Sequence, residues 1–314
     1  MNGHGGKTAF VFPGQASQRE GMAAELLEHS DEARGLFRRA GEILGLDLAA
    51  VCTTGNEAIL TRTDIAQPAL LTTCVAWLTA VRGRGVEAAM VAGHSLGEFS
   101  AWVAAGALEF EAALRLVRRR GELMEEAAQR NPGGMVAIIG LTDEQVAEIC
   151  QRASRAGLAK PANYNCPGQL VVSGERNALE EVARLAEAAE GRVMPLKVSG
   201  AFHSPLMDDA AREFAHLVAA LKIHNPAAPV VANASAEPIT AAEGVREAMS
   251  RQMTSPVLWT ASVRRMAADG ARLFVEIGPG KVLSGLIRRI SAEVKALPVG
   301  SIAQLDALEK EIQP

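Results

Sequence analysis

The chain of 314 residues has few cysteines, no long uncharged hydrophobic run and no large excess of charge of either sign. Its four cysteines form no CxxC pair and no Cys/His cluster with metal-ligand spacing, so neither a disulfide framework nor a zinc site is indicated. Reduced thiols in a cytoplasmic compartment are the simplest interpretation. The 32 Lys and Arg residues nearly balance the 36 Asp and Glu residues. No global positive field is therefore available to hold nucleic acid.

Targeting and membrane segments are also missing. The first residues lack a basic run followed by an apolar region, unlike a secretory signal. The longest stretch without charged side chains, residues 65–81, is interrupted by Gln67 and Pro68 and is too short for a membrane span. We predict a buried helix there, a cytoplasmic location and no membrane partner. Hydrophobic residues make up 48% of the chain, enough at this length for a sizeable core in one large or two smaller domains.

Short apolar runs that end in glycine-containing turns predict the core of the fold. Residues 8–12, 88–92 and 272–277 have the pattern of fully buried strands, and helical periodicity separates them. The other elements expected in this core are helices within 30–81 and at 96–105, 205–221, 241–253 and 258–268, a strand at 229–232 and a closing helix after 281. The sequence thus predicts an α/β fold with a mostly parallel sheet of the α/β-hydrolase-like type.

Residues 131–198 have a different pattern of predicted strands and helices. They predict strands at 135–140, 159–165, 169–174 and 192–198, with helices at 142–156 and 177–189. Thr142 and Gln145 have the spacing of a capping box at the start of the first helix. This βαββαβ order is that of a ferredoxin-like unit. We therefore expect a small ferredoxin-like subdomain, 131–198, inserted into a large α/β subdomain formed by 1–130 and 199–314.

The segment Gly93-His-Ser-Leu-Gly97 follows a predicted strand and precedes a predicted helix. Small residues two before and two after Ser95 allow strand and helix to crowd together, which exposes the hydroxyl at a sharp turn. Unpaired backbone N–H groups and the positive end of the helix dipole would stabilise negative charge on a nearby carbonyl oxygen. The Leu96 N–H is the natural first donor. We interpret Ser95 as a nucleophile and the adjacent His94 as a packing residue.

A serine nucleophile needs a base, and His203 is the leading candidate among six histidines. It lies in a loop between a predicted strand and a predicted helix, where catalytic groups are often displayed. An esterase would carry its acid between serine and histidine in the chain, but Asp143 is the only aspartate there, and helix capping explains it. The partner of His203 is thus expected to be a backbone carbonyl or a non-acidic side chain.

Six segments, in order and spread over nearly the whole chain, resemble the malonyl-CoA:acyl carrier protein transacylases. They are Phe10-Val-Phe-Pro-Gly-Gln-Ala-Ser-Gln18, Gly93-His-Ser-Leu-Gly-Glu98, Arg120-Gly121, Asn165-Cys-Pro-Gly-Gln169, Gly200-Ala-Phe-His203 and Glu276-Ile-Gly-Pro-Gly-Lys281. The family's small subdomain matches the predicted βαββαβ insertion.

The resemblance implies catalytic roles for five residues. Ser95 matches the acylated nucleophile and His203 its base. Gln15 matches the residue whose backbone N–H is the second oxyanion donor, beside that of Leu96. Gln252 matches the residue whose main-chain carbonyl orients the histidine, in keeping with the missing aspartate.

The resemblance also implies a substrate pocket. Arg120 matches the arginine that binds the malonyl carboxylate, although three consecutive arginines on a helix are by themselves typical of a solvated face. Phe202, before the histidine, is typical of family members that use malonyl rather than methylmalonyl groups. The remaining residues expected to line the pocket are Asn165, Gln169 and Met124.

The function implied is transfer of a malonyl group from malonyl-CoA to the phosphopantetheine thiol of an acyl carrier protein, through a malonyl-serine ester. No metal or other cofactor is expected, since phosphopantetheine belongs to the partner. We expect a monomer. Lys281, Arg288 and Arg289 are candidates for a basic rim toward the acidic carrier, with a solvated helix end as the plainer interpretation.

Three alternatives stay open at this level. A serine hydrolase or thioesterase acting on acyl-CoA differs only in what attacks the acyl-serine. A non-catalytic assembly partner would keep the fold without the chemistry, but Ser95, His203 and Arg120 are all intact. A trans-acting acyltransferase of a polyketide synthase would carry out the same reaction as an enzyme of fatty-acid synthesis.

Overall fold

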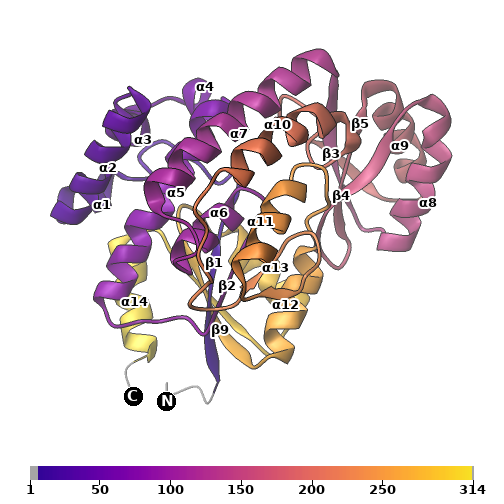
Figure 1. The fold of residues 1–314 in the computed structure, drawn as a ribbon. Coiled ribbons are helices and arrows are strands. Elements are labelled where there is room, and N and C mark those ends of the chain that lie inside the picture. The colour runs from indigo at the N-terminus through magenta and orange to yellow at the C-terminus, as the bar shows by residue number, and fades with distance from the viewer. Residues whose placement is uncertain (1–5, 313–314) are drawn as a thin grey trace.

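The computed structural model describes residues 6–312, which form two separate sheets with helices packed around them (Figure 1). The larger sheet has the strand order β10-β9-β1-β2-β7-β8, and all its pairs are parallel except β7 with β8. Its strands are β1 (Lys7–Phe12), β2 (Met90–Gly93), β7 (Val230–Val231), β8 (Pro238–Ile239), β9 (Ala271–Ile277) and β10 (Lys295–Val299). The predicted mostly parallel α/β core is confirmed.

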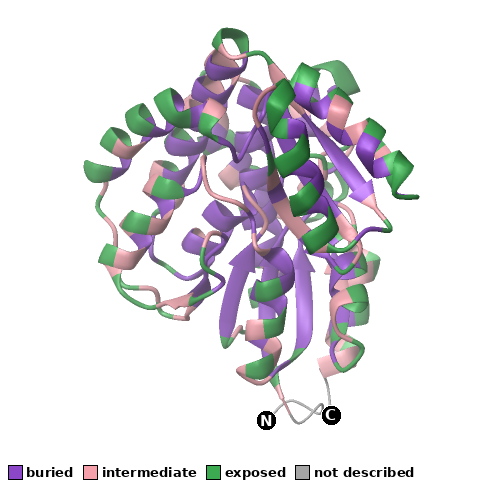
Figure 2. Ribbon diagram, turned by 90° about the vertical axis from the view of Figure 1, so that its right-hand side faces the viewer, coloured by how far each residue is buried: buried purple, intermediate pink, exposed green. Residues whose placement is uncertain are grey.

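Side chains that alternate along β1 enter two different hydrophobic clusters. Phe10 and Phe12 pack with helices on one face of the sheet, while Ala9 and Val11 pack with helices on the other. Both faces are therefore covered, and the central strands β1, β2 and β9 are buried along most of their length (Figure 2).

Helices lie between the strands of this sheet along the chain and after the last of them. In the first part of the chain they are α1 (Ala24–His29), α2 (Asp31–Leu44), α3 (Leu48–Thr54), α4 (Glu57–Leu60), α5 (Thr63–Gly83), α6 (Gly97–Ala104) and α7 (Phe110–Arg130). In the last part they are η2 (Pro205–Met207), α10 (Asp208–Ala219), α11 (Ala242–Arg251), α12 (Trp259–Ala268), α13 (Val282–Ile290) and α14 (Ile302–Ile312).

The α5 helix confirms the buried helix predicted from the uncharged stretch. By length and composition alone it could cross a membrane, but 89% of its most apolar window is buried inside the protein. It packs along α7 and α2 in the larger hydrophobic cluster.

Residues between the two parts form the second, antiparallel sheet. Its order is β4-β5-β3-β6, and the elements follow one another as β3 (Gly133–Ile139), α8 (Asp143–Ala153), η1 (Ser154–Ala156), β4 (Ala159–Cys166), β5 (Gln169–Glu175), α9 (Arg176–Ala188) and β6 (Arg192–Pro195). The predicted βαββαβ order is confirmed. The capping box is also confirmed, because Thr142 and Gln145 exchange side-chain and backbone hydrogen bonds.

Backbone hydrogen bonds join the second sheet to the rest of the protein beside α12. The Tyr164 N–H donates to Val257 O over 2.9 Å, and the Val257 N–H donates to Ala162 O over 2.8 Å. Strand β4 therefore pairs through its backbone with the segment that connects α11 to α12. This segment also contains Gln252 and Ser255.

Several predicted bounds were wrong. Strand β6 ends at Pro195 rather than 198, and the helix predicted from 205 begins as a short 3-10 turn. The helix after Lys281 does not close the fold, since β10 and α14 follow it. Strand β10 contains Pro298 and lies at the sheet edge, where a missing N–H is tolerated, so its sequence pattern is weak.

Two glycines allow the turn between β2 and α6. A Cβ on Gly97 would lie 2.0 Å from Phe12 O, and one on Gly93 would lie 2.0 Å from the carbonyl carbon of Gly97. These distances are far below contact, and the nearby atoms belong to the backbone, which cannot move aside as a flexible side chain can. Strand β1, strand β2 and helix α6 meet at this point with no room for a methyl group.

Gly97→Ala should therefore destabilise the fold by about 2 kcal/mol or more, because the backbone must shift. Gly35, inside α2, makes a matched control, because a Cβ added there would have no atom within 4 Å. Gly35→Ala should instead raise the free energy of unfolding by about 0.5–1 kcal/mol, through reduced chain entropy. Urea unfolding of the two variants measures both; equal effects would contradict the steric account.

Candidate active site

Ser95 stands at the turn between β2 and α6 with its hydroxyl against an imidazole. Its φ of 51° lies in the left-handed region that is unfavourable for residues other than glycine. The Ser95 N–H donates to Asn233 Oδ1 over 2.7 Å, which helps to hold the turn. Ser95 Oγ lies 2.7 Å from His203 Nε2. The structure thus brings together the two residues that the sequence paired.

His203 lies in the loop between β6 and η2, and it too has a positive φ, of 58°. Its Nδ1 lies 3.1 Å from Gln252 O and 3.0 Å from Ser255 O. Both partners are carbonyl oxygens, so Nδ1 carries the proton and Nε2 is free to accept one from Ser95. The prediction of a backbone carbonyl as the orienting group is confirmed, with a second carbonyl that the sequence did not reveal.

Burial keeps the imidazole neutral. It lowers the pKa of His203 to about 3, and the nearby Arg120 guanidinium acts in the same direction. The two carbonyl contacts oppose this shift only in part. His203 is therefore unprotonated at neutral pH.

Two backbone N–H groups that the sequence assigned to the site, those of Leu96 and Gln15, lack a partner in the described part of the chain. The loop that contains Gln15 is pressed against the serine turn, since a Cβ on Gly14 would lie 2.4 Å from His94 O. The Gln15 side chain points to Thr63 Oγ1, over 3.4 Å.

Arg120 is a buried cation beside the nucleophile. Its side chain on α7 is 1% exposed, and its Nη2 lies 3.4 Å from Ser95 Oγ. Nε and Nη2 both donate to Gln252 Oε1, and Nη1 donates to Gln67 Oε1. The guanidinium also lies over the Phe99 ring, 5.5 Å from its centroid. Burial lowers the pKa of Arg120 to about 10, so it remains charged at neutral pH.

The two preceding arginines, Arg118 and Arg119, lie on a solvated helix face, as the run of three arginines by itself predicts. Arg118 pairs with Glu122 and Asp64, and Arg119 pairs with acidic side chains of α7 and α10. Both are about one-third exposed. Of the three neighbours, only Arg120 turns to the serine.

Gln252 connects these groups with its side chain as well as its carbonyl. Its Oε1 accepts from Arg120, while its Nε2 donates to Ser95 O over 2.8 Å and to Glu98 Oε2 over 2.7 Å. The residue is 1% exposed. The contact of its carbonyl with His203 was expected from the resemblance, whereas its amide contacts were not.

The other expected pocket residues differ in how they relate to the site. Met124 is buried, and its Sδ lies 3.3 Å from Nε2 of Gln67, the residue that holds Arg120. Asn165 Oδ1 lies 2.9 Å from His94 Nε2, next to the nucleophile.

Phe202 is buried in the same hydrophobic cluster as Met124. Gln169 is turned elsewhere: its Oε1 accepts from Arg289 Nη1 over 2.8 Å, and no hydrogen bond within residues 6–312 links it to the catalytic groups.

Three buried polar residues near the serine escaped sequence analysis as site residues: Gln67, Glu98 and Asn233. Each had a signal. Gln67 interrupts an uncharged stretch, Glu98 follows the serine turn inside an apolar helix start, and Asn233 comes directly after a buried strand. What the sequence could not supply was the partner of each polar group.

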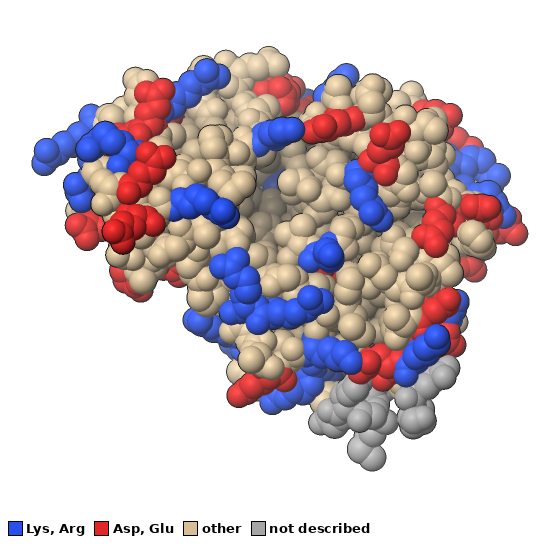
Figure 3. All heavy atoms as spheres, turned by 180° about the vertical axis from the view of Figure 1, so that it is seen from behind, with Lys and Arg blue, Asp and Glu red and all other residues tan. Residues whose placement is uncertain are grey.

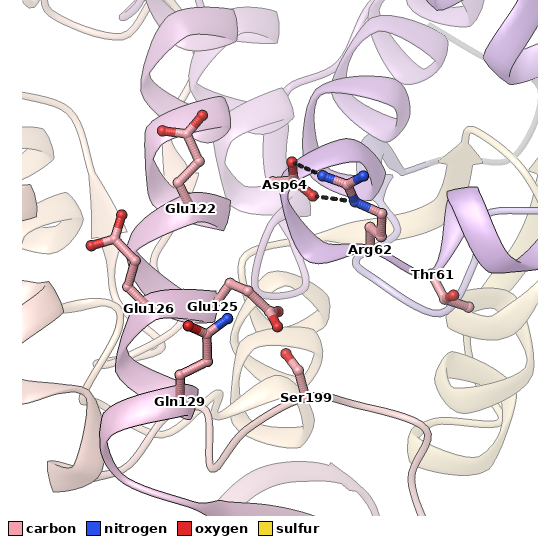
Figure 4. Close-up of a pocket in the computed structure, with 8 residues that line it drawn as sticks. All are labelled: Thr61, Arg62, Asp64, Glu122, Glu125, Glu126, Gln129 and Ser199. Atoms are coloured by element: carbon pink, nitrogen blue, oxygen red, sulfur yellow. Dashed lines mark hydrogen bonds and ion pairs between the residues drawn. The ribbon is translucent and has the colours of Figure 1, made fainter.

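A cavity of about 520 Å³ is lined by acidic side chains together with Arg62 and does not include Ser95, His203 or Arg120 among its lining residues. Figure 4 shows Glu122, Glu125 and Glu126 along one side of it, from α7, with Asp64 held by Arg62 on the other. Asp64, Glu122 and Glu126 are each paired with arginines, which compensate most of the negative charge at this cavity. Within the described part of the chain, no group of three or more His, Cys, Asp or Glu side chains could hold a metal ion.

Comparison with known proteins gives a consistent result. The acyl transferase domain model matches residues 9–306. The malonyl CoA-acyl carrier protein transacylase of Bacillus subtilis (strain 168) is 43% identical over 295 residues, 93% of each chain. The protein of the same name from Escherichia coli (strain K12) is 43% identical over 284 residues, which cover 90% of this chain and 92% of the relative.

Solved structures agree. An acyl carrier protein S-malonyltransferase from Vibrio cholerae superposes with a TM-score of 0.93 at 42% identity, over 96% of this chain and 99% of the other. A malonyl-transacylase solved in complex with a type II polyketide synthase acyl carrier protein gives a TM-score of 0.94 at 38% identity, over 97% of this chain and 99% of the other.

The neutral state of His203 predicts a pH-dependent stability. An unfolded histidine takes up a proton near pH 6.5, while the folded one does so only near pH 3. The unfolded chain thus binds more protons in this window, so His203 lowers stability progressively as the pH falls through it. We expect the free energy of unfolding of the wild type, minus that of His203→Gln, to decrease from pH 6.5 toward pH 4. A constant difference, measured by denaturant titration, would contradict a neutral buried imidazole.

Proposed function

The chain belongs to the acyl transferase family and is a malonyl-CoA:acyl carrier protein transacylase, and we propose that Ser95, His203 and Arg120 carry its chemistry. The observation that carries this proposal is the single buried cluster in which the Ser95 hydroxyl contacts both an unprotonated imidazole and a cation. A nucleophile, a base and a cation that can pair with a carboxylate therefore lie close enough together to act on one substrate molecule.

In the first step, the Ser95 hydroxyl proton passes to His203 Nε2 as Oγ attacks the thioester carbonyl carbon of malonyl-CoA. The N–H groups of Leu96 and Gln15 stabilise the oxyanion of the tetrahedral intermediate. The carbon–sulfur bond then breaks, and the proton on Nε2 passes to the departing CoA sulfur. The carbonyls of Gln252 and Ser255 stabilise the transient imidazolium, and a malonyl-serine ester remains.

Arg120 has two N–H groups left for the malonyl carboxylate. A guanidinium has five N–H donors, and three of them donate to the amides of Gln252 and Gln67. One N–H on Nη2 makes only the 3.4 Å contact with Ser95 Oγ, and one on Nη1 has no partner among the described residues. Together they can hold a carboxylate through charge-assisted hydrogen bonds. Phe202 and Met124 would pack beside the acyl chain, with Asn165 behind the serine turn.

In the second step, the phosphopantetheine thiol of the acyl carrier protein attacks the malonyl ester, and the same groups act in reverse. Figure 3 shows one face of the molecule on which Lys and Arg side chains gather beside a hollow. Arg289 is anchored near the second sheet by Gln169 and by Pro167 O. We propose that Lys281, Arg288 and Arg289 form a basic rim that faces the acidic carrier protein. Gln169 would help to hold Arg289 in this rim through its hydrogen bond.

The remaining features follow from the same proposal. The reaction needs no metal or other cofactor, and we propose a monomeric, cytoplasmic enzyme. We divide it into a large subdomain, 1–130 with 199–314, and a ferredoxin-like one, 131–198; residues 1–5 and 313–314 lie outside the described part. The likeness to α/β-hydrolases concerns the strand–turn–helix at Ser95. The malonylated carrier would serve fatty-acid or polyketide synthesis.

Arg120→Ala should lower kcat/KM for malonyl transfer by at least about 100-fold, since two charge-assisted bonds to the carboxylate contribute about 1.5–3 kcal/mol each. Acetyl transfer, which has no carboxylate to bind, should be kept or increased. Transfer from malonyl-CoA and acetyl-CoA to one carrier protein measures both. An equal loss for the two substrates would remove Arg120 from substrate recognition.

Malonyl-CoA without a carrier protein should release one equivalent of CoA in a burst and leave a stable malonyl adduct on Ser95. The reason is that transfer requires a thiol to accept the acyl group. Stopped-flow thiol detection and intact-protein mass spectrometry follow the two products, with Ser95→Ala as the blank. Sustained CoA release would indicate the hydrolase alternative.

A further inference from the structure

Glu98 is a buried carboxylate next to the site that the proposed mechanism does not use. It lies in the first turn of α6, three residues after the nucleophile, and is 1% exposed. Its two oxygens have different partners: Oε1 accepts the Asn233 N–H and Oε2 accepts from Gln252 Nε2, each over 2.7 Å. Burial raises the pKa of Glu98 to about 7, while the Asn233 N–H, the Gln252 amide and the charge of Arg120 favour its ionised form. Two donors that hold a buried carboxylate against this cost call for an explanation.

The partners of Glu98 are the two residues that hold the serine turn. Asn233 accepts the Ser95 N–H and donates from Nδ2 to Gly93 O over 2.5 Å. Gln252 donates to Ser95 O and accepts from Arg120. One carboxylate thus links the loop after β7 to the loop after α11.

The orientation of the Gln252 amide depends on this carboxylate. The –NH2 side of the amide faces two acceptors, Glu98 Oε2 and Ser95 O, while its oxygen faces the donors of Arg120. A 180° flip would place donors against donors at the guanidinium and oxygen against oxygen at Glu98. The amide therefore lies between a carboxylate and a guanidinium, and both fix it in one orientation.

We propose that Glu98 is a positioning residue that sets the malonyl selectivity of the enzyme, by fixing the Gln252 amide and through it the Arg120 guanidinium. This inference rests on the proposed function of Arg120. Glu98 touches neither the acyl group nor His203; it acts through Gln252.

Only a group with two acceptor oxygens can fill this role. A glutamine at position 98 offers one oxygen and one –NH2 group to two donors, so one of the two contacts becomes repulsive. If its oxygen stays on the Asn233 N–H, its –NH2 group faces Gln252 and favours the flipped amide. Arg120 then loses the acceptor for two of its N–H groups.

The test is the isosteric variant Glu98→Gln. We expect kcat/KM for malonyl transfer to fall about 10- to 100-fold, as is usual when a buried polar group is left unpaired, and acetyl transfer to fall less than about 3-fold. The ratio of malonyl to acetyl transfer is the decisive quantity. A loss of general stability alone would lower both rates together.

Glu276→Gln is the matched control. Glu276 is also fully buried and also accepts two N–H groups, those of Leu283 and Ser284, but within residues 6–312 it makes no hydrogen bond to a site residue. This variant should lower the melting temperature and leave the malonyl-to-acetyl ratio unchanged.

A double-mutant cycle tests whether Glu98 acts through the amide. Gln252→Leu removes the amide but keeps the carbonyl that contacts His203, so it should lower the ratio by itself. The double variant Glu98→Gln/Gln252→Leu should match Gln252→Leu within about 2-fold. The double variant places no donor against a donor, so this comparison remains available if Glu98→Gln alone fails to fold.

Two results would overturn the proposal: an equal change of malonyl and acetyl transfer in Glu98→Gln, or a further tenfold drop of the ratio when Glu98→Gln is added to Gln252→Leu. Either could occur while the wild type transfers malonyl normally. Absence of transfer in the wild type would instead refute the proposed function itself.

Discussion

The active site depends on one buried residue, Gln252, whose polar groups are all engaged at once. Its carbonyl accepts from His203, its amide oxygen accepts from Arg120, and its –NH2 group donates to the serine backbone and to Glu98. A side chain with every donor and acceptor satisfied in a dry environment has a single orientation. His203 and Arg120 therefore keep their places relative to Ser95 before any substrate arrives, which is the preorganisation that the proposed mechanism requires.

Burial has opposite consequences for the two basic side chains of the site, His203 and Arg120. It makes His203 neutral, because an imidazole with an ordinary pKa near 6.5 cannot keep its proton beside Arg120. It leaves Arg120 charged, since the pKa of a guanidinium is high enough to remain near 10 after desolvation. The same environment thus produces a base and a cation side by side. The strained φ values of Ser95 and His203 show that the fold also stores backbone strain at these two residues.

The two sheets meet where these groups are supported. The segment from Gln252 to Val257 supplies both carbonyls to His203 and continues as a hydrogen-bonded partner of β4. Asn165, at the end of β4, contacts His94 beside the nucleophile. The histidine orientation therefore rests on the junction of the large and the small sheet, with the serine turn contributed by the large sheet alone.

Sequence alone determined the elements whose signals are local. The strand–glycine–serine–glycine–helix order at 93–97, the capping box at Thr142 and the βαββαβ rhythm each follow from a few neighbouring residues, because backbone sterics and periodicity act over short distances. The resemblance singled out Arg120 among three consecutive arginines, which local sequence cannot distinguish. Tertiary structure alone decided that Glu98 and Asn233 support the turn and that Gln169 points to Arg289 instead of the serine. Those outcomes depend on the pairing of polar groups from segments far apart in the chain, and such pairing exists only when the chain is packed.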